Sequence, residues 1–163
     1  MDAISLTRPD EGFRPLTVPS GHFLAEHGPL MGRLDGDVFR LGLRIDDVHV
    51  NAGNICHGGM MMAFADTQLV LGAMHKLNEF GFLLTINMTV DFVRPGLVGS
   101  WLEGETKVIR ATRNMVFVET ILTVDGETAL RASGILRRVD GPPLDPGQFR
   151  SDEATPRLGN HGE

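Results

Sequence analysis

One stretch constrains this chain more than any other: between His57 and His75 the only charged residue is Asp66, and its neighbours are almost all apolar. A helix that is hydrophobic on every side is usually a buried one. An ionised carboxylate in such surroundings costs several kcal/mol unless it is hydrogen-bonded or neutralised. The stretch therefore predicts a core helix that carries one acid with a candidate functional role.

The core helix is predicted over residues 59–76. Asn78 and Gly81 follow it, and Asn and Gly commonly end helices. At 1.5 Å per residue the helix is about 27 Å long, which falls short of the usual membrane-spanning length. We therefore expect no membrane partner for this helix.

After the helix the apolar residues recur with a period of two, which predicts strands. Leu84, Ile86, Met88, Val90 and Phe92 alternate with polar residues and predict one buried strand face. Further strands are predicted at residues 101–109, 115–124 and 127–139. The last two are joined by Asp125-Gly126, the strongest hairpin signal in the chain.

The order of the predicted elements indicates the fold class. Residues 34–45 form a strand pair or one long strand with a turn at Gly36, and residues 46–56 form a loop. With the helix and four later strands, this predicts an α+β fold in which an antiparallel sheet of five to six strands wraps around one long central helix. One helix cannot cover the sheet and its edges, so we expect the chain to pair with another copy.

Composition limits the remaining organisation and the function classes. The 163 residues suit one domain, predicted at residues 28–139, between an N-terminal arm (1–27) with one short helix and a flexible tail (140–163). The net charge of −6 without a dense basic block weighs against a nucleic-acid platform, so no nucleic-acid partner is expected. The single cysteine and a start without signal-peptide character indicate a cytoplasmic protein. The six histidines lack metal-ligand spacing, so no metal is expected.

Two features of the sequence provide candidate catalytic groups. Gly58 and Gly59 open the helix; they either serve a tight turn that has no room for Cβ, or leave main-chain N–H groups free to bind a negative oxygen. Asp66 is either satisfied by hydroxyl or backbone donors, or is a desolvated base or nucleophile. Together they predict a carbonyl-polarising donor and an acid.

The residues before the helix are less specific. Asn51 either caps a loop or positions water or substrate. His57 is better suited to locking the loop than to acting as a base, because a protonated histidine gains nothing from the dipole at a helix start. Cys56 beside it forms no nucleophile pair, because adjacent side chains diverge.

The motif Asn51-Ala-Gly-Asn-Ile-Cys-His57-Gly58-Gly59, followed by Asp66 in an apolar helix, resembles the hotdog-fold acyl-CoA thioesterases. The closest branch is the phenylacetate-degradation type, and the resemblance spans about residues 30–139. It implies a hotdog fold, assembly as a homodimer or homotetramer, and sites at subunit interfaces. It also implies that Asp66 is the catalytic base or nucleophile and that the Gly58 N–H is the oxyanion hole.

The same resemblance assigns supporting roles. Asn51 corresponds to an asparagine that positions water or substrate, and His57 to a histidine that is more often structural. Thr85 corresponds to a position where some relatives carry an assisting serine, and Gly59 lies beside the oxyanion glycine in the substrate site. Three arginines are candidates for the phosphates of coenzyme A or, alternatively, solvated strand ends: Arg94, Arg110 and Arg113.

We therefore expect an acyl-CoA thioesterase that needs no cofactor beyond the coenzyme A of its substrate. A non-catalytic acyl-CoA or lipid-binding module on the same scaffold is the alternative. A hydratase of the same fold ranks third, because no close pairing of an aspartate and a histidine is evident.

Overall fold

The computed structural model describes residues 10–18 and 20–141. The predicted tail (140–163) lies outside the described residues from residue 142 onward, and so does the start of the predicted arm, residues 1–9. The elements follow in the order β1 (Arg14–Pro15), α1 (Phe23–Glu26), β2 (Met31–Asp35), β3 (Val38–Arg44), η1 (Asp47–His49), α2 (Gly58–Leu77), β4 (Leu83–Phe92), β5 (Trp101–Ala111), β6 (Met115–Val124) and β7 (Glu127–Arg138).

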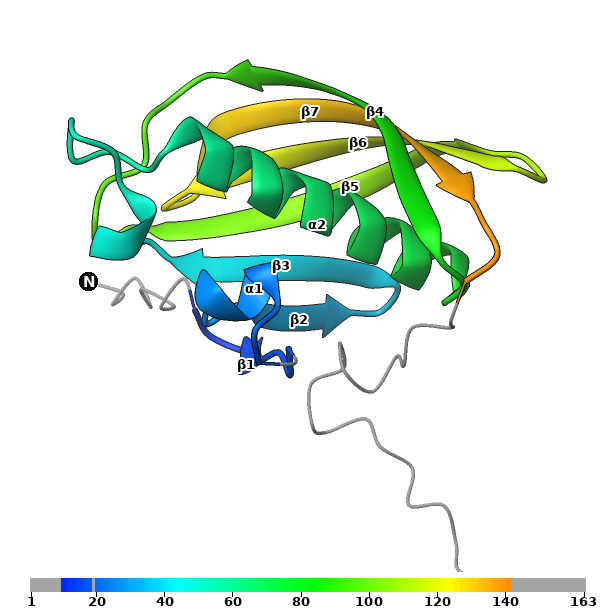
Figure 1. Ribbon diagram of the computed structural model, residues 1–163, viewed down its shortest axis with the longest axis horizontal. Coiled ribbons are helices and arrows are strands. Elements are labelled where there is room, and N and C mark those ends of the chain that lie inside the picture. Colours follow the sequence, from blue (N-terminus) through cyan, green and yellow to red (C-terminus); the bar gives the residue numbers. More distant parts are fainter. Residues whose placement is uncertain (1–9, 19, 142–163) are drawn as a thin grey trace, which may run out of the picture.

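The described strands form one antiparallel sheet in the order β1-β2-β3-β5-β6-β7-β4. Figure 1 shows this sheet curving around the single long helix α2, while the short helix α1 lies over β2 and β3. The predicted α+β architecture is confirmed. The sheet has seven strands instead of five to six, because the two-residue β1 is too short to produce a periodic signal.

The predicted element bounds agree with the structure to within a few residues. α2 begins one residue earlier and ends one residue later than predicted, at Leu77. Its C-cap is Asn78, whose φ of 52° is the left-handed conformation expected at a helix end. The strand pair before the helix turns at Gly36. The predicted loop 46–56 contains one turn of 3₁₀ helix, η1.

The core lies between α2 and the inner face of the sheet. Leu69 and Phe64 of α2 are at most 1% exposed. Gln68, also fully buried, bonds to the N–H of Leu41 and the C=O of Phe39 at the place where β3–β5 pairing ends. The side-chain amide of Gln68 thus joins α2 to β3 at the end of the β3–β5 pairing.

The predicted buried face of β4 is wrong in its first half and at its last residue, Phe92, which is 54% exposed. A bulge between Thr85 and Asn87 changes the side to which side chains point, so Leu84 and Ile86 are 47% and 48% exposed while Thr85 turns inward. β4 is also an edge strand. Figure 1 shows this strand bending over α2, and the hydroxyl of Thr85 reaches Asp66 of that helix.

Candidate active site

The start of α2 is fixed by its own cap. His57 is the N-cap residue, and its Nδ1 accepts a hydrogen bond from the Gly59 N–H at 2.9 Å. The C=O of His57 accepts from the N–H groups of Met60 and Met61, which are the next donors of the first turn. The structure thus places His57 as a loop-locking residue.

The Gly58 N–H is the donor of this turn that remains available, because it has no hydrogen-bond partner within residues 10–18 and 20–141. A Cβ at Gly58 would lie 3.3 Å from Cζ of Phe92, a ring that comes from the end of β4 and is 54% exposed. The absence of a side chain keeps the space between the helix start and this ring open. A substrate oxygen can therefore approach the main chain here.

Asp66 is half-buried near the middle of α2, two turns after Gly58. Its Oδ1 accepts a hydrogen bond of 2.7 Å from the hydroxyl of Thr85. The bulge in β4 is what turns Thr85 toward the helix, so the pair depends on an irregularity of the strand. Thr85, predicted to assist or to bind substrate, lies against the acid itself.

The structure of one protomer does not bring Gly58 and Asp66 together. Eight residues separate them on one helix, which corresponds to about 12 Å along the axis at 1.5 Å per residue. A carbonyl oxygen at the Gly58 N–H and a carboxylate attacking the same carbonyl must lie within about 3 Å of their targets. A single chain therefore carries two separated halves of the predicted site.

Asn51 and Cys56 belong to the loop that leads to the helix. The Asn51 Oδ1 accepts from the Gly53 N–H at 2.8 Å, and the Asn51 N–H donates to the Ile55 C=O. This is a loop-capping arrangement, which leaves the Nδ2 amide hydrogens and one lone pair of Oδ1 of Asn51 for a ligand. Burial raises the pKa of the Cys56 thiol to about 11, in line with a cysteine that is no nucleophile.

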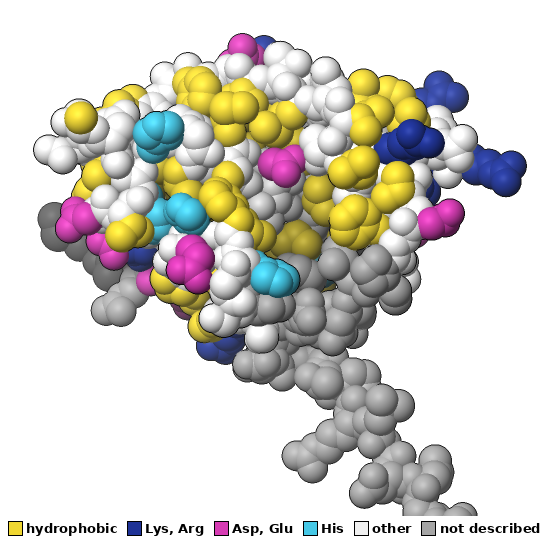
Figure 2. All heavy atoms as spheres, in the orientation of Figure 1, with side chains coloured by type: hydrophobic (Ala, Val, Ile, Leu, Met, Phe, Trp, Pro, Cys, Tyr) yellow, Lys and Arg dark blue, Asp and Glu magenta, His cyan; other side chains and the backbone are white. Residues whose placement is uncertain are grey.

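The three predicted phosphate-binding arginines differ in their contacts. Arg94 makes an ion pair with Glu127. Arg110 and Arg113 lie at the β5–β6 hairpin, are exposed, and make no ion pair with another described residue. Figure 2 shows basic side chains gathered at the end of the molecule where this hairpin lies in Figure 1. Only the hairpin arginines are thus free to receive an anion without breaking a contact.

Sequence reasoning missed one residue that organises the site. His49 is 2% exposed; its Nδ1 accepts from the Asp46 N–H, and its Nε2 lies 3.0 Å from the C=O of His27. Its own C=O accepts from the His57 N–H at 2.8 Å. His49 therefore ties the N-terminal arm to the start of α2. Contacts between residues 22 positions apart leave no local signal in the sequence.

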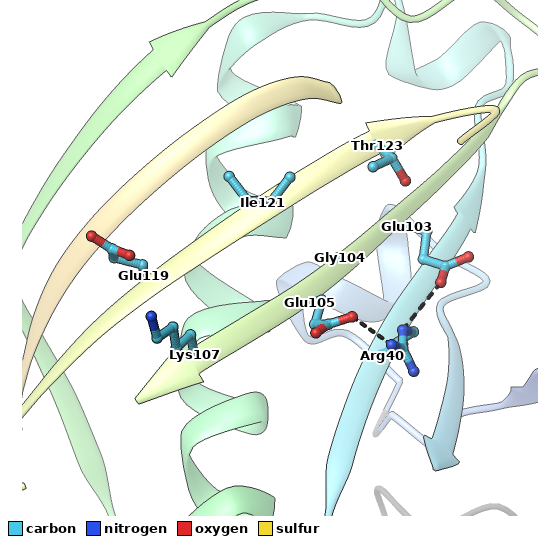
Figure 3. A pocket seen from close by; sticks show the side chains of 8 residues that line it. All are labelled: Arg40, Glu103, Gly104, Glu105, Lys107, Glu119, Ile121 and Thr123. Atoms are coloured by element: carbon cyan, nitrogen blue, oxygen red, sulfur yellow. Dashed lines mark hydrogen bonds and ion pairs between the residues drawn. The ribbon is translucent and has the colours of Figure 1, made fainter. Parts of the chain in front are cut away.

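A larger cavity, of about 350 Å³, lies elsewhere. Its side chains stand on the face of the sheet turned away from α2, and Arg40 makes ion pairs there with Glu103 and Glu105 (Figure 3). It is not part of the candidate site. Among the described residues no group of His, Cys, Asp or Glu is arranged to hold a metal ion, and no helix is long and apolar enough to cross a membrane.

Comparisons with known proteins point to one family. A family model described as the thioesterase superfamily matches residues 53–129. The chain is 32% identical over 126 residues to a Pseudomonas aeruginosa protein named "Putative esterase PA0474", which covers 77% of this chain and 93% of that protein.

Two solved structures show the likeness in three dimensions. The E. coli PaaI protein from the phenylacetic acid degradation operon matches with a TM-score of 0.64 at 19% identity, over 74% of this chain and 87% of the other. A hypothetical thioesterase of Streptococcus pneumoniae, solved with coenzyme A, matches with a TM-score of 0.57 at 12% identity, over 63% and 79% of the two chains. The predicted hotdog fold is confirmed.

Proposed function

Because the chain belongs to the thioesterase superfamily and is a thioester hydrolase, we propose that it cleaves an acyl-CoA into a free acid and coenzyme A. The observation that carries this proposal is the combination of an available N–H at Gly58 with a hydroxyl-bound acid at Asp66. The similar Streptococcus pneumoniae thioesterase that contains coenzyme A supports the choice of carrier.

The Gly58 N–H holds the carbonyl oxygen of the thioester. Negative charge builds up on this oxygen when the carbonyl carbon becomes tetrahedral, and a fixed main-chain donor at a helix start stabilises that charge. A donor of this kind typically lowers the barrier by about 3–4 kcal/mol. Gly59 allows the same close approach, although its own N–H is bound to His57.

Asp66 starts the reaction in one of two ways. As a general base it takes a proton from water, the water oxygen bonds to the thioester carbon, and the intermediate collapses with loss of the thiolate, which then takes up a proton. As a nucleophile its carboxylate bonds to that carbon and expels the thiolate, and water then hydrolyses the resulting anhydride. In both versions the Thr85 hydroxyl holds the carboxylate in place.

The two halves act together across a subunit interface. Since one helix keeps Gly58 and Asp66 about 12 Å apart, Asp66 of a second copy completes the site. The edge strand β4 is the surface for this contact, because its edge opposite β7 has no neighbouring strand in the described sheet and the strand exposes Leu84, Ile86 and Phe92. Figure 2 shows hydrophobic side chains spread over much of this face of the molecule. A homodimer is the smallest assembly that satisfies this arrangement, and a homotetramer would contain it.

Arginines at the strand ends bind the phosphates of coenzyme A in this proposal. Arg110 and Arg113 are the better candidates, because neither has an acid partner among the described residues. Arg94 contributes only by leaving Glu127. No cofactor takes part beyond the coenzyme A of the substrate.

Complementation of two inactive variants tests the proposal. Asp66→Asn removes the base or nucleophile, and Gly58→Val closes the oxyanion site against Phe92. We expect each alone to lose about 10²- to 10⁴-fold in thiol release from acyl-CoA. When the two are unfolded together and refolded as a mixture, half of the dimers are mixed and carry one intact site of two. About a quarter of the wild-type activity should return.

The control is Asp37→Asn, which removes an exposed carboxylate that pairs with Lys76, at the end of α2 opposite Gly58. It should hydrolyse acyl-CoA as the wild type does. Near-wild-type activity of Asp66→Asn would disprove the assigned chemistry, and absence of recovery in the mixture would disprove the shared site. Saturable acyl-CoA binding by the wild type without any thiol release would favour the non-catalytic binding module.

A further inference from the structure

A second feature lies beside the start of α2. A pocket of about 220 Å³ opens between α1, η1 and the first turn of α2. Its lining combines apolar side chains with the rings of three histidines, so we call it the histidine pocket. Its main side chains are Phe23, Val48, Met60, His27, His49 and His57.

His49 forms the frame of the histidine pocket. Its Nδ1 accepts from the N–H of Asp46 at 2.9 Å, and its Nε2 lies 3.0 Å from the carbonyl oxygen of His27. A carbonyl can only accept and an N–H can only donate, so the His49 ring is neutral with its proton on Nε2. Both ring nitrogens are thus occupied, and His49 offers nothing to a ligand.

The other two histidines each keep one ring nitrogen for a ligand. The Nδ1 of His27 lies 2.8 Å from the carbonyl oxygen of Phe23, so this nitrogen carries a proton; when the ring is neutral, its Nε2 is an acceptor. The Nδ1 of His57 accepts from the Gly59 N–H, so its proton is on Nε2. Neither Nε2 has a partner in the described part of the chain. The pocket therefore combines one acceptor with one donor.

A secondary amide is the common group that matches such a pair, because it presents one C=O and one N–H. The apolar side chains around the histidines suit methylene groups on either side of the amide. The carrier arm of coenzyme A and that of acyl-carrier proteins share this chemistry, since both are chains of methylenes and secondary amides that end in the thiol.

We propose, building on the function proposed above, that the histidine pocket binds the amide-bearing carrier arm of the thioester. An amide C=O accepts from His57 Nε2–H, and an amide N–H donates to His27 Nε2. The pocket lining includes His57 and Gly59, the two residues that flank Gly58, while the Phe92 ring lies 3.3 Å from a Cβ built on Gly58 and is not part of that lining. The substrate is thereby oriented, with its carrier arm toward α1 and its acyl group toward Phe92 and β4.

Two variants of His27 separate a binding role from a structural one. His27→Asn keeps a donor near the Nδ1 position for the Phe23 carbonyl but removes the acceptor at Nε2. His27→Gln places an amide oxygen near the Nε2 position and restores that acceptor. His22→Asn is the control, because His22 is an exposed histidine next to the same short helix whose ring makes no cap hydrogen bond.

The readout is hydrolysis of one acyl group on three carriers: coenzyme A, N-acetylcysteamine, which has a single amide, and ethanethiol, which has none. In His27→Asn we expect KM to rise about 3- to 10-fold for both amide-bearing carriers with kcat unchanged. The S-ethyl ester should react as with wild type, and His27→Gln should recover most of the loss. Coenzyme A and acyl-carrier protein are separated by repeating the assay with an acyl-carrier protein thioester.

An equal loss on all three carriers, or no loss on any, would overturn the proposal. Should the wild type hydrolyse no thioester, the proposed function fails, and binding of free pantetheine to the wild type and to His27→Asn still tests the pocket. Weaker binding by the variant supports the pocket, and equal binding rejects it.

Discussion

The hydrogen bond between Thr85 and Asp66 offers the sharpest test of how the acid is held. Thr85→Val keeps the size and the β-branched shape of the side chain but removes the hydroxyl that donates to Asp66 Oδ1 at 2.7 Å. Thr85→Ser is the matched control, because it keeps the hydroxyl and loses only a methyl group.

The expected magnitude follows from the geometry of this bond. A short O–H donor to a carboxylate is charge-assisted, and hydrogen bonds to charged groups contribute about 1.5–3 kcal/mol. At 1.36 kcal/mol per factor of ten, full loss of that orientation would slow the chemical step about 10- to 150-fold. Because Asp66 is only half-buried, water replaces part of the lost bond, and we expect the lower end, about tenfold.

The assay is thiol release from acyl-CoA, with kcat and KM measured separately. A hydroxyl that positions the acid lowers kcat and leaves KM unchanged, whereas a hydroxyl that binds substrate directly raises KM. Thermal unfolding of both variants shows whether they are folded at the assay temperature. The reasoning is refuted if Thr85→Val keeps kcat within about twofold of the wild type, or if Thr85→Ser loses as much as Thr85→Val.

Two further predictions concern groups buried in the core. Gln68→Leu leaves the Leu41 N–H and the Phe39 C=O without their partner. The free energy of unfolding, measured in urea, should therefore fall by about 2–5 kcal/mol. A change under about 1 kcal/mol would contradict the role of this amide. The Cys56 thiol, whose pKa burial raises from 9.0 to about 11, carries about 100-fold less thiolate at pH 8 than the same thiol in the unfolded chain. Iodoacetamide should therefore alkylate the native protein at least about 100-fold more slowly than the urea-unfolded protein, and equal rates would contradict the burial.

The elements that the sequence predicted well are those whose signal is local. α2 could be predicted because the apolar run between His57 and His75 carries one charge, Asp66, and because Asn78 follows the helix. Strands β5 to β7 have a regular period and short turns, so their bounds also follow from pattern alone. The two-residue β1 and the single turn η1 are too short for any period to indicate them.

The contacts of the candidate site were beyond such patterns. Gly58 and Asp66 could be named from residue type and spacing, but the partner of the acid could not. Thr85 faces α2 only because a bulge shifts β4 by one residue, and a regular period of two places its neighbours Leu84 and Ile86 on that side instead. The role of His49 could likewise not be predicted, because the fold and not the spacing in the sequence brings its partners His27 and Asp46 together.

The error in β4 has a physical cause that bears on assembly. An apolar period shows that a strand face avoids water, but it does not show whether that face is covered by its own chain or by another copy. In one protomer Leu84, Ile86 and Phe92 are about half-exposed, on an edge strand whose backbone is open to pairing. A second copy that pairs with β4 would bury these side chains and provide partners for the open backbone groups of the edge strand. The same copy would supply the carboxylate that lies too far from Gly58 on its own helix. A single subunit contact would therefore cover the exposed strand and complete the divided site.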